Sequence, residues 1–373
     1  MTFVSGSGTQ RTGNLAPPVI GGAPPDLVGT EVGINTVYRL KRLIATGGMG
    51  AVYEAEQFGT DGFVKLVAVK VLLPELSDNQ EFISMFMDEA KLAGCLVHQN
   101  IVQIYQLGRS GRQYFIAMEY IDGIDLEQFM SFHTAQGKRV PVEIAEFIAS
   151  RICRGLEYAH NRRDERGERL EVVHRDISPR NIMITSEGEV KIADFGVAKA
   201  RLKAAADMQD NIMVGKIPYM SPEQATYEPT DPRSDIFSLG VVFYELLTGV
   251  KIFDKPSESE AIREITTGSV PDPRIRRADI SDAVAGIVMR CLERKAALRH
   301  QTAGDLGYAL ESHMYSKGYG PTIVTLAQYM AKLYPDRRFY AAPSRGDNLK
   351  SSVLSGAGQP TPLQGVPPAS PIL

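Results

Sequence analysis

The sequence predicts an α+β protein in which a small, strand-rich lobe is followed by a larger helical lobe. Apolar-rich runs separated by Gly-containing turns dominate as far as residue 120, which is typical of strands. Helical patterns dominate from residue 124 onward. At both ends of the chain the apolar residues follow neither the helical nor the strand periodicity. A β-rich first part and an α-rich second part indicate two lobes with a cleft between them.

The predicted small lobe covers about residues 38–120. Apolar-rich runs between turn residues predict five strands, and one further run predicts a helix. A turn at Gly59–Gly62 is expected to join the second and third strands as a hairpin. The expected strands are Tyr38–Ile44, Ala51–Phe58, Phe63–Leu72, Ile101–Leu107 and Gln113–Glu119, with the helix at Gln80–Leu96.

The predicted larger lobe covers about residues 121–312. Val142–His160 carries apolar residues at the spacing of one helical face and predicts an amphipathic helix. Short strands are expected at Ile182–Thr185 and Val190–Ala193, on either side of a Ser-Glu-Gly turn. The most apolar stretch, Ile236–Phe253, holds charged residues and two glycines, so a buried helix is favoured over a membrane span.

After residue 312 the sequence predicts a helical extension and then a tail. The extension, residues 313–340, includes Gly320–Tyr334, whose apolar residues share one helical face. This helix is expected to pack either on the larger lobe or on a partner. Residues 1–37 and 341–373 are rich in Gly and Pro and poor in charge, so we expect both to be disordered.

Composition argues against several kinds of protein. With 41 Lys and Arg against 44 Asp and Glu, the net charge of −3 offers no basic field, and neither nucleic acid nor a membrane is an expected partner. Cys95, Cys153 and Cys291 are too scattered for a disulfide framework or a paired zinc site. No basic cluster followed by an apolar core marks an export signal, so we expect a cytoplasmic location.

Four short patterns that suit phosphate chemistry follow one another along the chain. Glycines allow backbone N–H groups to approach phosphate oxygens. A carboxylate can accept a proton, and carboxylate and amide oxygens can bind a divalent cation. Taken singly, each pattern also fits a flexible hairpin, a solvent-facing lysine or turn residues that bond their own backbone. The patterns are Ala45-Thr46-Gly47-Gly48-Met49-Gly50, Val67-Ala68-Val69-Lys70, His174-Arg175-Asp176-Ile177-Ser178-Pro179-Arg180-Asn181 and Asp194-Phe195-Gly196.

In this order and spacing the motifs resemble those of the protein kinase family, specifically the bacterial serine/threonine kinases that look like eukaryotic ones. The resemblance covers about residues 38–312 and includes Ser221-Pro222-Glu223, Asp235 and Arg299. It implies the two-lobed protein kinase fold and ATP- and Mg²⁺-dependent transfer of phosphate to serine or threonine hydroxyls of protein substrates in signalling. Mn²⁺ is an alternative cation, and a homodimer is a candidate assembly.

The resemblance also implies which residues handle the phosphates. Lys70, held by Glu89, would contact the α- and β-phosphates of ATP beneath the Gly-rich turn. Asp176 would accept or orient the proton of the substrate hydroxyl. Asn181 and Asp194 would hold magnesium.

An adenine pocket between the lobes is the next implication of the resemblance. Apolar walls with backbone hydrogen-bonding groups are what a purine site requires. Plain core packing is the alternative for the three wall residues. In chain order the pocket residues are Val52 and Ala68 (upper wall), Met118 (gatekeeper), Glu119 and Ile121 (backbone contacts) and Met183 (floor).

Three departures from the family pattern concern nucleotide affinity, surface and regulation. Ala45 replaces the usual first glycine, from which we expect tuned rather than lost nucleotide affinity. The highly charged insert Asn161–Leu170 is interpreted as a solvated hairpin, with a docking site as the alternative. No threonine lies between Gly196 and Pro222 to be phosphorylated and to pair with Arg175, so we expect activity without activation-loop phosphorylation.

A fourth departure concerns the charge beside Asp176. Most serine/threonine kinases carry a lysine two residues after this aspartate and a threonine after the glycine of the docking loop. Here Ser178 and Lys216 stand at those positions, so we expect the two to have exchanged chemical roles in catalysis. The alternative is that Arg180 supplies the charge and Lys216 is solvated.

Three other functions compete with that of an active protein kinase. A pseudokinase scaffold is disfavoured by the complete set of motif residues. A small-molecule phosphotransferase is disfavoured by Ser221-Pro222-Glu223, which in the family belongs to the peptide-docking platform. A dual-specificity kinase remains an alternative, because Arg180 is also typical of tyrosine kinases.

Overall fold

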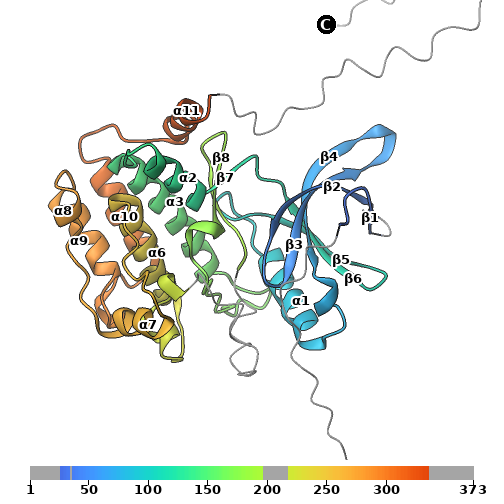
Figure 1. Cartoon of the computed structure of the whole chain (residues 1–373), viewed down its shortest axis with the longest axis horizontal. Coiled ribbons are helices and arrows are strands. Elements are labelled where there is room, and N and C mark those ends of the chain that lie inside the picture. The colour runs from blue at the N-terminus through green and yellow to red at the C-terminus, as the bar shows by residue number, and fades with distance from the viewer. Residues whose placement is uncertain (1–25, 34–35, 196–216, 336–373) are drawn as a thin grey trace, which may run out of the picture. The chain divides into compact units, whose positions relative to one another are not determined.

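The computed structural model of the chain describes residues 26–33, 36–195 and 217–335. Strands gather in a small lobe and most helices in a larger one (Figure 1). The small lobe contains a six-stranded sheet and α1, and a three-stranded sheet belongs to the larger lobe. The predicted α+β class is therefore confirmed.

The six-stranded sheet has the order β1-β2-β3-β4-β6-β5, and each neighbouring pair is antiparallel. The predicted hairpin turn between the second and third strands is present as a short 3₁₀ helix at Thr60–Gly62. The elements of this lobe are β1 (Glu31–Val32), β2 (Tyr38–Thr46), β3 (Gly50–Phe58), β4 (Val64–Leu72), α1 (Gln80–Gly94), β5 (Ile104–Ser110) and β6 (Gln113–Glu119).

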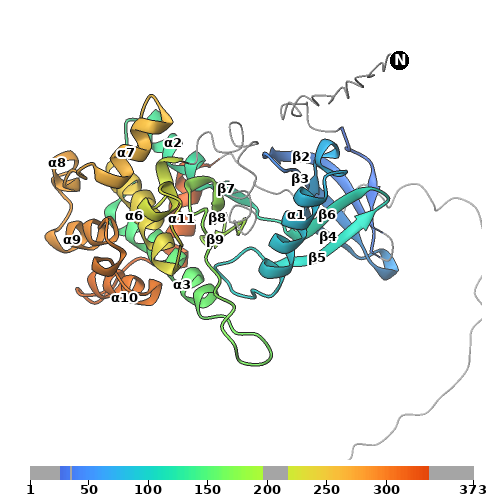
Figure 2. The same cartoon turned by 90° about the horizontal axis from the view of Figure 1, so that it is seen from below.

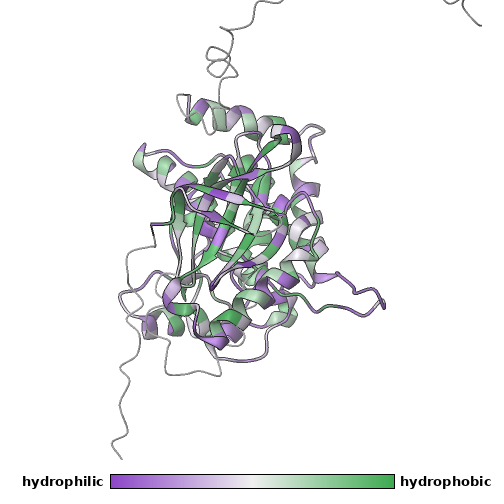
Figure 3. Ribbon diagram, turned by 90° about the vertical axis from the view of Figure 1, so that its right-hand side faces the viewer, coloured by the Kyte–Doolittle hydropathy of each residue, from purple (hydrophilic) through white to green (hydrophobic). Residues whose placement is uncertain are grey.

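Alternation along β4 gives its two faces different neighbours. Every second residue from Val67 to Val71 is buried in the apolar cluster shared with β2 and β3. Hydrophobic and hydrophilic residues are mixed along the strands of the sheet (Figure 3). Leu72 belongs instead to a second cluster with Phe86 of α1. Because Lys70 shares the face of Leu72, the fold directs Lys70 toward α1.

Two predictions for the small lobe were wrong in their boundaries. The stretch 1–37, expected to be disordered, contains β1, where Val32 is buried and pairs with Tyr38. This pairing satisfies backbone groups on the edge of β2, which the Gly-rich composition of the segment does not reveal. The strand expected to begin at Ile101 begins at Ile104, because Ile101 forms a bridge with Ile192 of the larger lobe instead.

The larger lobe is built around α6, whose residues from Ser234 to Thr248 are all buried. This confirms the buried helix, and no helix among the described residues is long and apolar enough to cross a membrane. The elements of this lobe are β7 (Gly123–Asp125), α2 (Leu126–Ala135), α3 (Val142–His160), β8 (Ile182–Thr185), β9 (Val190–Ile192), α5 (Pro222–Ala225), α6 (Pro232–Thr248), α7 (Glu258–Thr267), α8 (Pro273–Arg276), α9 (Asp282–Cys291), α10 (Ala303–Met314) and α11 (Ile323–Leu333).

The helix expected within Gly320–Tyr334 is α11, and it packs on the larger lobe. Leu326 and Met330 are fully buried, and the hydroxyl of Tyr329 lies 2.7 Å from Nε2 of His133 on α2. The sequence left open whether this helix packs on the larger lobe or on a partner, and in the structure it packs on the larger lobe.

The charged insert 161–170 projects from the end of α3 as an exposed loop (Figure 2). Arg163 and Arg169 form an antiparallel bridge across it, and Asp164 N donates a hydrogen bond to Glu168 O at 2.9 Å. The insert is therefore a short solvated hairpin, as expected.

Candidate active site

Lys70 lies between two carboxylates from distant parts of the chain. Its Nζ donates a hydrogen bond to Glu89 Oε1 of α1 at 2.7 Å and another to Asp194 Oδ1, just after β9, at 3.0 Å. The Lys70 side chain is only 12% exposed, so these acids rather than water compensate its charge. Three residues singled out from the sequence thus meet across the two lobes.

The charges in this cluster shift one another's ionisation. Burial alone lowers the pKa of Lys70, but the carboxylates of Asp194 and Glu89 outweigh burial and raise that pKa above its usual value. Burial raises the pKa of Glu89, which the Lys70 ammonium partly offsets. One ammonium facing two acids leaves an excess of negative charge that a divalent cation would neutralise.

The loop His174–Asn181 is anchored by the buried carboxylate of Asp235. Asp235 accepts hydrogen bonds from the backbone N–H groups of His174 and Arg175 and from His160 Nε2, all at 2.8 Å. Burial alone would raise the pKa of Asp235, but the two histidines hold it below its usual value. This anchoring supports the left-handed backbone of Arg175 (φ 61°), a conformation that costs a non-glycine residue about 1–3 kcal/mol.

Asp176 and Asn181 are held together inside this loop. Asn181 Nδ2 donates to the backbone oxygen of Asp176 at 2.8 Å and to its Oδ2 at 3.0 Å. Because the amide nitrogen is used in this way, the amide oxygen of Asn181 is the atom suited to a cation. Ser178 is 4% exposed, and its Oγ has no hydrogen-bond partner among the described residues. A bound group would satisfy this hydroxyl.

The Gly-rich turn between β2 and β3 is open to solvent along residues 45–48. Gly47 N donates to Gly50 O at 2.8 Å, and Met49 is half-buried against the apolar cluster beside α1. A Cβ at Gly50 would lie 2.8 Å from Val71 O, so this position requires glycine. The turn therefore leaves exposed backbone beside the strand that carries Lys70.

The wall residues of the expected adenine pocket come from both lobes. Ala68 on β4 pairs with Met118 on β6, whereas Met183 lies on β8. Val52 and Met183 are half-buried although their immediate neighbours in the same strands are buried. Plain core packing therefore does not account for these two residues.

Met118 lines an enclosed cavity of about 20 Å³ together with Lys70, Glu89 and Asp194. Apolar residues that the sequence analysis left without a role complete its wall. Two of them stand two residues before Met118 and Asp194, so the strand period of two could have found them. Ala93 follows Glu89 by one helical turn on α1, and Phe195 directly follows Asp194. Val102 and Ile104 come from the segment after α1 and arrive through pairing with distant segments. The added residues are Ala93, Val102, Ile104, Ile116, Ile192 and Phe195.

Comparison with known proteins agrees with this geometry. A family model described as "Protein kinase domain" matches residues 38–306. The chain belongs to the protein kinase family.

This kinase chain is similar to named bacterial proteins. "Tyrosine-protein kinase MasK" of Myxococcus xanthus is 35% identical over 333 residues, which are 89% of this chain and 51% of MasK. "Serine/threonine-protein kinase PrkC" of Bacillus subtilis is 35% identical over 273 residues, which are 73% of this chain and 40% of PrkC. The chain thus spans about half or less of the length of these curated relatives.

Solved structures show the same fold. The PknI kinase domain of Mycobacterium tuberculosis superposes with a TM-score of 0.54 at 26% sequence identity. The superposition covers 74% of this chain and 95% of the PknI chain. The expected kinase fold is therefore confirmed.

The kinase family uses ATP and a divalent cation, and the donor groups present fit that requirement. Asp194 supplies a carboxylate and Asn181 an amide oxygen, and Ala193 N donates to Asn181 O at 2.8 Å, which brings the two segments together. Within the described ranges no three His, Cys, Asp or Glu residues form a cage for a metal. Mg²⁺ bound by few protein ligands together with nucleotide phosphates matches so sparse a set.

Two basic residues of the loop His174–Asn181 form hydrogen bonds with side chains outside this loop. Arg175 Nε donates to Thr230 Oγ1 at 3.0 Å. Arg180 is well exposed, and its Nε donates to Glu127 Oε2 of α2 at 2.6 Å. Lys216 lies outside the described residues, so its exchange of roles with Ser178 stays a prediction.

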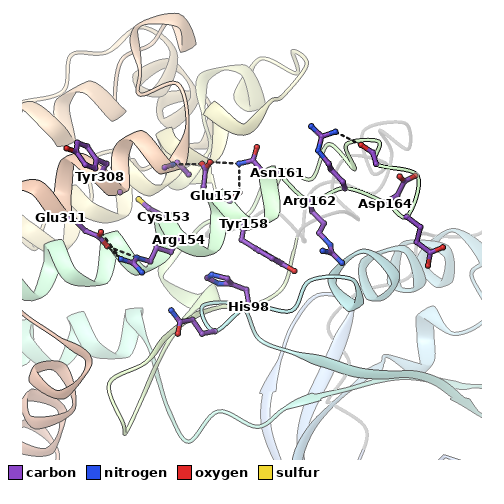
Figure 4. Close-up of a pocket in the computed structure, with 17 residues that line it drawn as sticks. His98, Cys153, Arg154, Glu157, Tyr158, Asn161, Arg162, Asp164, Tyr308 and Glu311 are labelled. Carbon is purple, nitrogen blue, oxygen red and sulfur yellow. Dashed lines mark hydrogen bonds and ion pairs between the residues drawn. The ribbon is translucent and has the colours of Figure 1, made fainter.

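A larger groove lies beside α3, lined by α10 and the charged insert (Figure 4). Its volume is about 1010 Å³. Arg154 is ion-paired with Glu311 at 2.8 Å, and Glu157 accepts a hydrogen bond from Gly304 N at 2.7 Å. None of the candidate catalytic or nucleotide-binding residues lines this groove.

Proposed function

We propose that this protein transfers the γ-phosphate of ATP to serine or threonine hydroxyls of protein substrates, with Mg²⁺ as the cation and Mn²⁺ as an alternative. The supporting observation is the buried Lys70 ammonium, 2.7 Å from Glu89 and 3.0 Å from Asp194. Asp176 and Asn181 add a proton acceptor and a second cation ligand. This set is sufficient because phosphoryl transfer depends mainly on positioning and charge neutralisation.

Each residue of the set has a separate task in this proposal. Glu89 keeps Lys70 charged and directed at the nucleotide phosphates. Asp194 and the amide oxygen of Asn181 hold the cation, which when bound neutralises charge on the phosphate oxygens. Asp176 orients the acceptor hydroxyl and takes its proton.

Nucleotide specificity in this proposal comes from the segment between the lobes. Adenine lies between Val52 and Ala68 on one side and Met183 on the other, while the backbone of Glu119 and Ile121 hydrogen-bonds its edge. The partial exposure of Val52 and Met183 supports a pocket at this place. The exposed backbone of the Gly-rich turn binds the phosphates.

The acceptor residue is serine or threonine in this proposal, with tyrosine as the competing outcome. PrkC and the PknB protein of Mycolicibacterium smegmatis are named serine/threonine kinases, and MasK is named a tyrosine kinase. We also infer a kinase domain at residues 38–312 and a role in cytoplasmic signalling, with a homodimer as a candidate assembly. Light scattering of the purified chain tests the dimer.

Labelled ATP with Mg²⁺ and a mixed protein acceptor such as casein tests the activity. Acid hydrolysis followed by phosphoamino-acid separation should show phosphoserine and phosphothreonine for the wild type. Label found mainly in phosphotyrosine would show that tyrosine, rather than serine or threonine, is the acceptor residue. Absence of any label would contradict the kinase proposal and favour a scaffold.

A further inference from the structure

An ion pair joins the two lobes where the chain passes from one to the other. Glu119 ends β6, and the residues that follow it lead to β7. Lys191 lies on β9, in the three-stranded sheet of the larger lobe (Figure 2). The distance between Lys191 Nζ and Glu119 Oε1 is 2.9 Å. This contact is separate from the Lys70 cluster.

The carboxylate of Glu119 also binds the segment that follows α1. Its Oε2 accepts a hydrogen bond from Gln103 N at 3.2 Å, and Glu119 N donates to Gln103 O at 2.8 Å. One residue earlier, Val102 N donates to Ile192 O of β9 at 2.9 Å. The segment after α1, the end of β6 and β9 therefore meet around this one carboxylate.

Lys191 is a buried charge beside the expected floor of the adenine pocket. It is 7% exposed, and lysine is rarely buried so deeply unless it is paired. Lys191 is the strand partner of Met183, so the two side chains lie on one face of the sheet. Glu189 also lies near the amine, at 3.5 Å, but Glu119 is closer and less exposed.

We propose that Glu119 and Lys191 are positioning residues for the nucleotide, an inference that rests on the proposed kinase function. Their ion pair fixes the spacing between the backbone of Glu119 and the side chain of Met183, and a flat ring binds between these two. Lys191→Met removes the cation beside the Glu119 carboxylate, and loss of the Glu119 charge leaves the buried Lys191 with the more distant and more exposed Glu189, at 3.5 Å. Either change weakens the contact between β6 and β9. Loss of the pair therefore weakens nucleotide binding more than the chemical step.

Calorimetric titration of the full chain with Mg²⁺ and a non-hydrolysable ATP analogue measures this effect without turnover. Lys191→Met should weaken binding about tenfold, which corresponds to about 1.4 kcal/mol of binding free energy. Lys191→Arg retains the charge and should restore most of the affinity. In steady-state assays, KM for ATP should rise while kcat at saturating ATP changes little.

Arg151→Met is a control in the larger lobe that removes an ion-pair partner of similar burial, while Glu311 keeps Arg154 at 2.8 Å. Arg151 and Glu311 lie 2.6 Å apart, with side chains 11% and 24% exposed against 8% and 25% for Lys191 and Glu119. This control should lower the melting temperature and leave the affinity for the analogue unchanged. Glu119→Gln, which keeps the shape of the side chain, carries the test if Lys191→Met does not fold.

The outcomes separate this inference from the proposed function. Unchanged affinity in both Lys191→Met and Glu119→Gln would overturn the inference and leave the kinase proposal intact. An equal loss of affinity in Arg151→Met would also overturn it, because the effect would then be general destabilisation. A wild type that binds no analogue would overturn the inference and the proposed function together.

Discussion

The cleft around Lys70 and the groove beside α3 are both lined with charged side chains, but the charges in the cleft are buried and unequal in number, whereas those in the groove form an exposed ion pair. In the cleft one buried ammonium faces two carboxylates contributed by α1 and by the segment after β9. Asp194 there adopts a left-handed backbone conformation, with φ of 52°. Buried, unequal charges and unusual backbone conformations are typical of functional sites.

The groove holds charges that belong to ordinary helix packing. Arg154 is 47% exposed and pairs with Glu311, while Glu157 accepts a hydrogen bond from the backbone at the start of α10. The groove measures about 1010 Å³, against about 20 Å³ for the cavity behind Met118. Volume alone would therefore favour the groove, whereas the arrangement of the charges favours the cleft.

The largest expected effect comes from removing charge from the cleft. Lys70→Met and Asp194→Ala should each lower the rate of phosphoryl transfer by at least about 10³-fold, because each removes a charge that acts on the transferred group. Measured rates of ATP-dependent labelling test this, with circular dichroism showing that the variants are folded. Full activity in either variant, in preparations free of contaminating kinases, would move the site elsewhere.

Substitution of Asp235, which anchors the loop His174–Asn181, should have the next largest effect. Asp235→Asn breaks a buried, charge-assisted network and should lower the free energy of unfolding by about 3–5 kcal/mol. Because the pKa of Asp235 is lowered in the fold, its stabilisation is present above the unfolded value near pH 3.9 and is lost as pH falls through the folded pKa. Urea unfolding at several pH values measures both effects. A difference below about 1 kcal/mol at pH 7 would contradict the anchoring role.

Lys216 tests whether the cleft contains a further charge. If Lys216 and Ser178 have exchanged roles, Lys216→Ala should lower kcat by about 10²–10³-fold with a smaller change in KM for ATP. The double change Ser178→Lys with Lys216→Thr should then be more active than either single change, a coupling that a double-mutant cycle measures. A near-normal rate for Lys216→Ala together with a collapsed rate for Arg180→Ala would assign the charge to Arg180.

The smallest effect is expected in the groove. Arg154→Ala removes an exposed ion-pair partner and should cost about 0–1 kcal/mol of stability. The phosphoryl-transfer rate should stay within about twofold of wild type, since the groove carries none of the reacting groups. Thermal unfolding and the labelling assay measure these two quantities. A rate change comparable to that of a cleft variant would give the groove a role in activity.

Local sequence patterns predicted those parts of the fold that depend on local chemistry. The apolar run around Val67-Ala68-Val69-Lys70 predicted the strand that carries Lys70, whereas its partner Glu89 was implied by the resemblance to the kinase family; the structure brings the two into contact. The apolar character of Ile236–Phe253 predicted a buried helix, which is α6. Each of these features can be recognised from the residues of a single strand, helix or short motif.

Features that depend on pairing between distant segments could not be predicted. Nothing near Val32 indicates that this residue will join the edge of β2. The contact between Glu119 and Lys191 spans two lobes, and each residue alone resembles a surface charge. Arg180 and its partner Glu127 on α2 both belong to the larger lobe, but they too are far apart in the sequence. Long-range contacts of this kind follow from the assembled fold.

The most direct test compares initial rates of phosphate transfer from ATP for wild type, Asp194→Asn and Arg154→Ala in one assay with Mg²⁺. Asp194→Asn keeps the size of the side chain and removes one charge from the cleft, and Arg154→Ala removes one charge from the groove. We expect a wild-type rate in Arg154→Ala and a loss of at least about 10³-fold in Asp194→Asn. Comparable rates in Asp194→Asn and wild type would contradict the assignment of catalysis to the cleft.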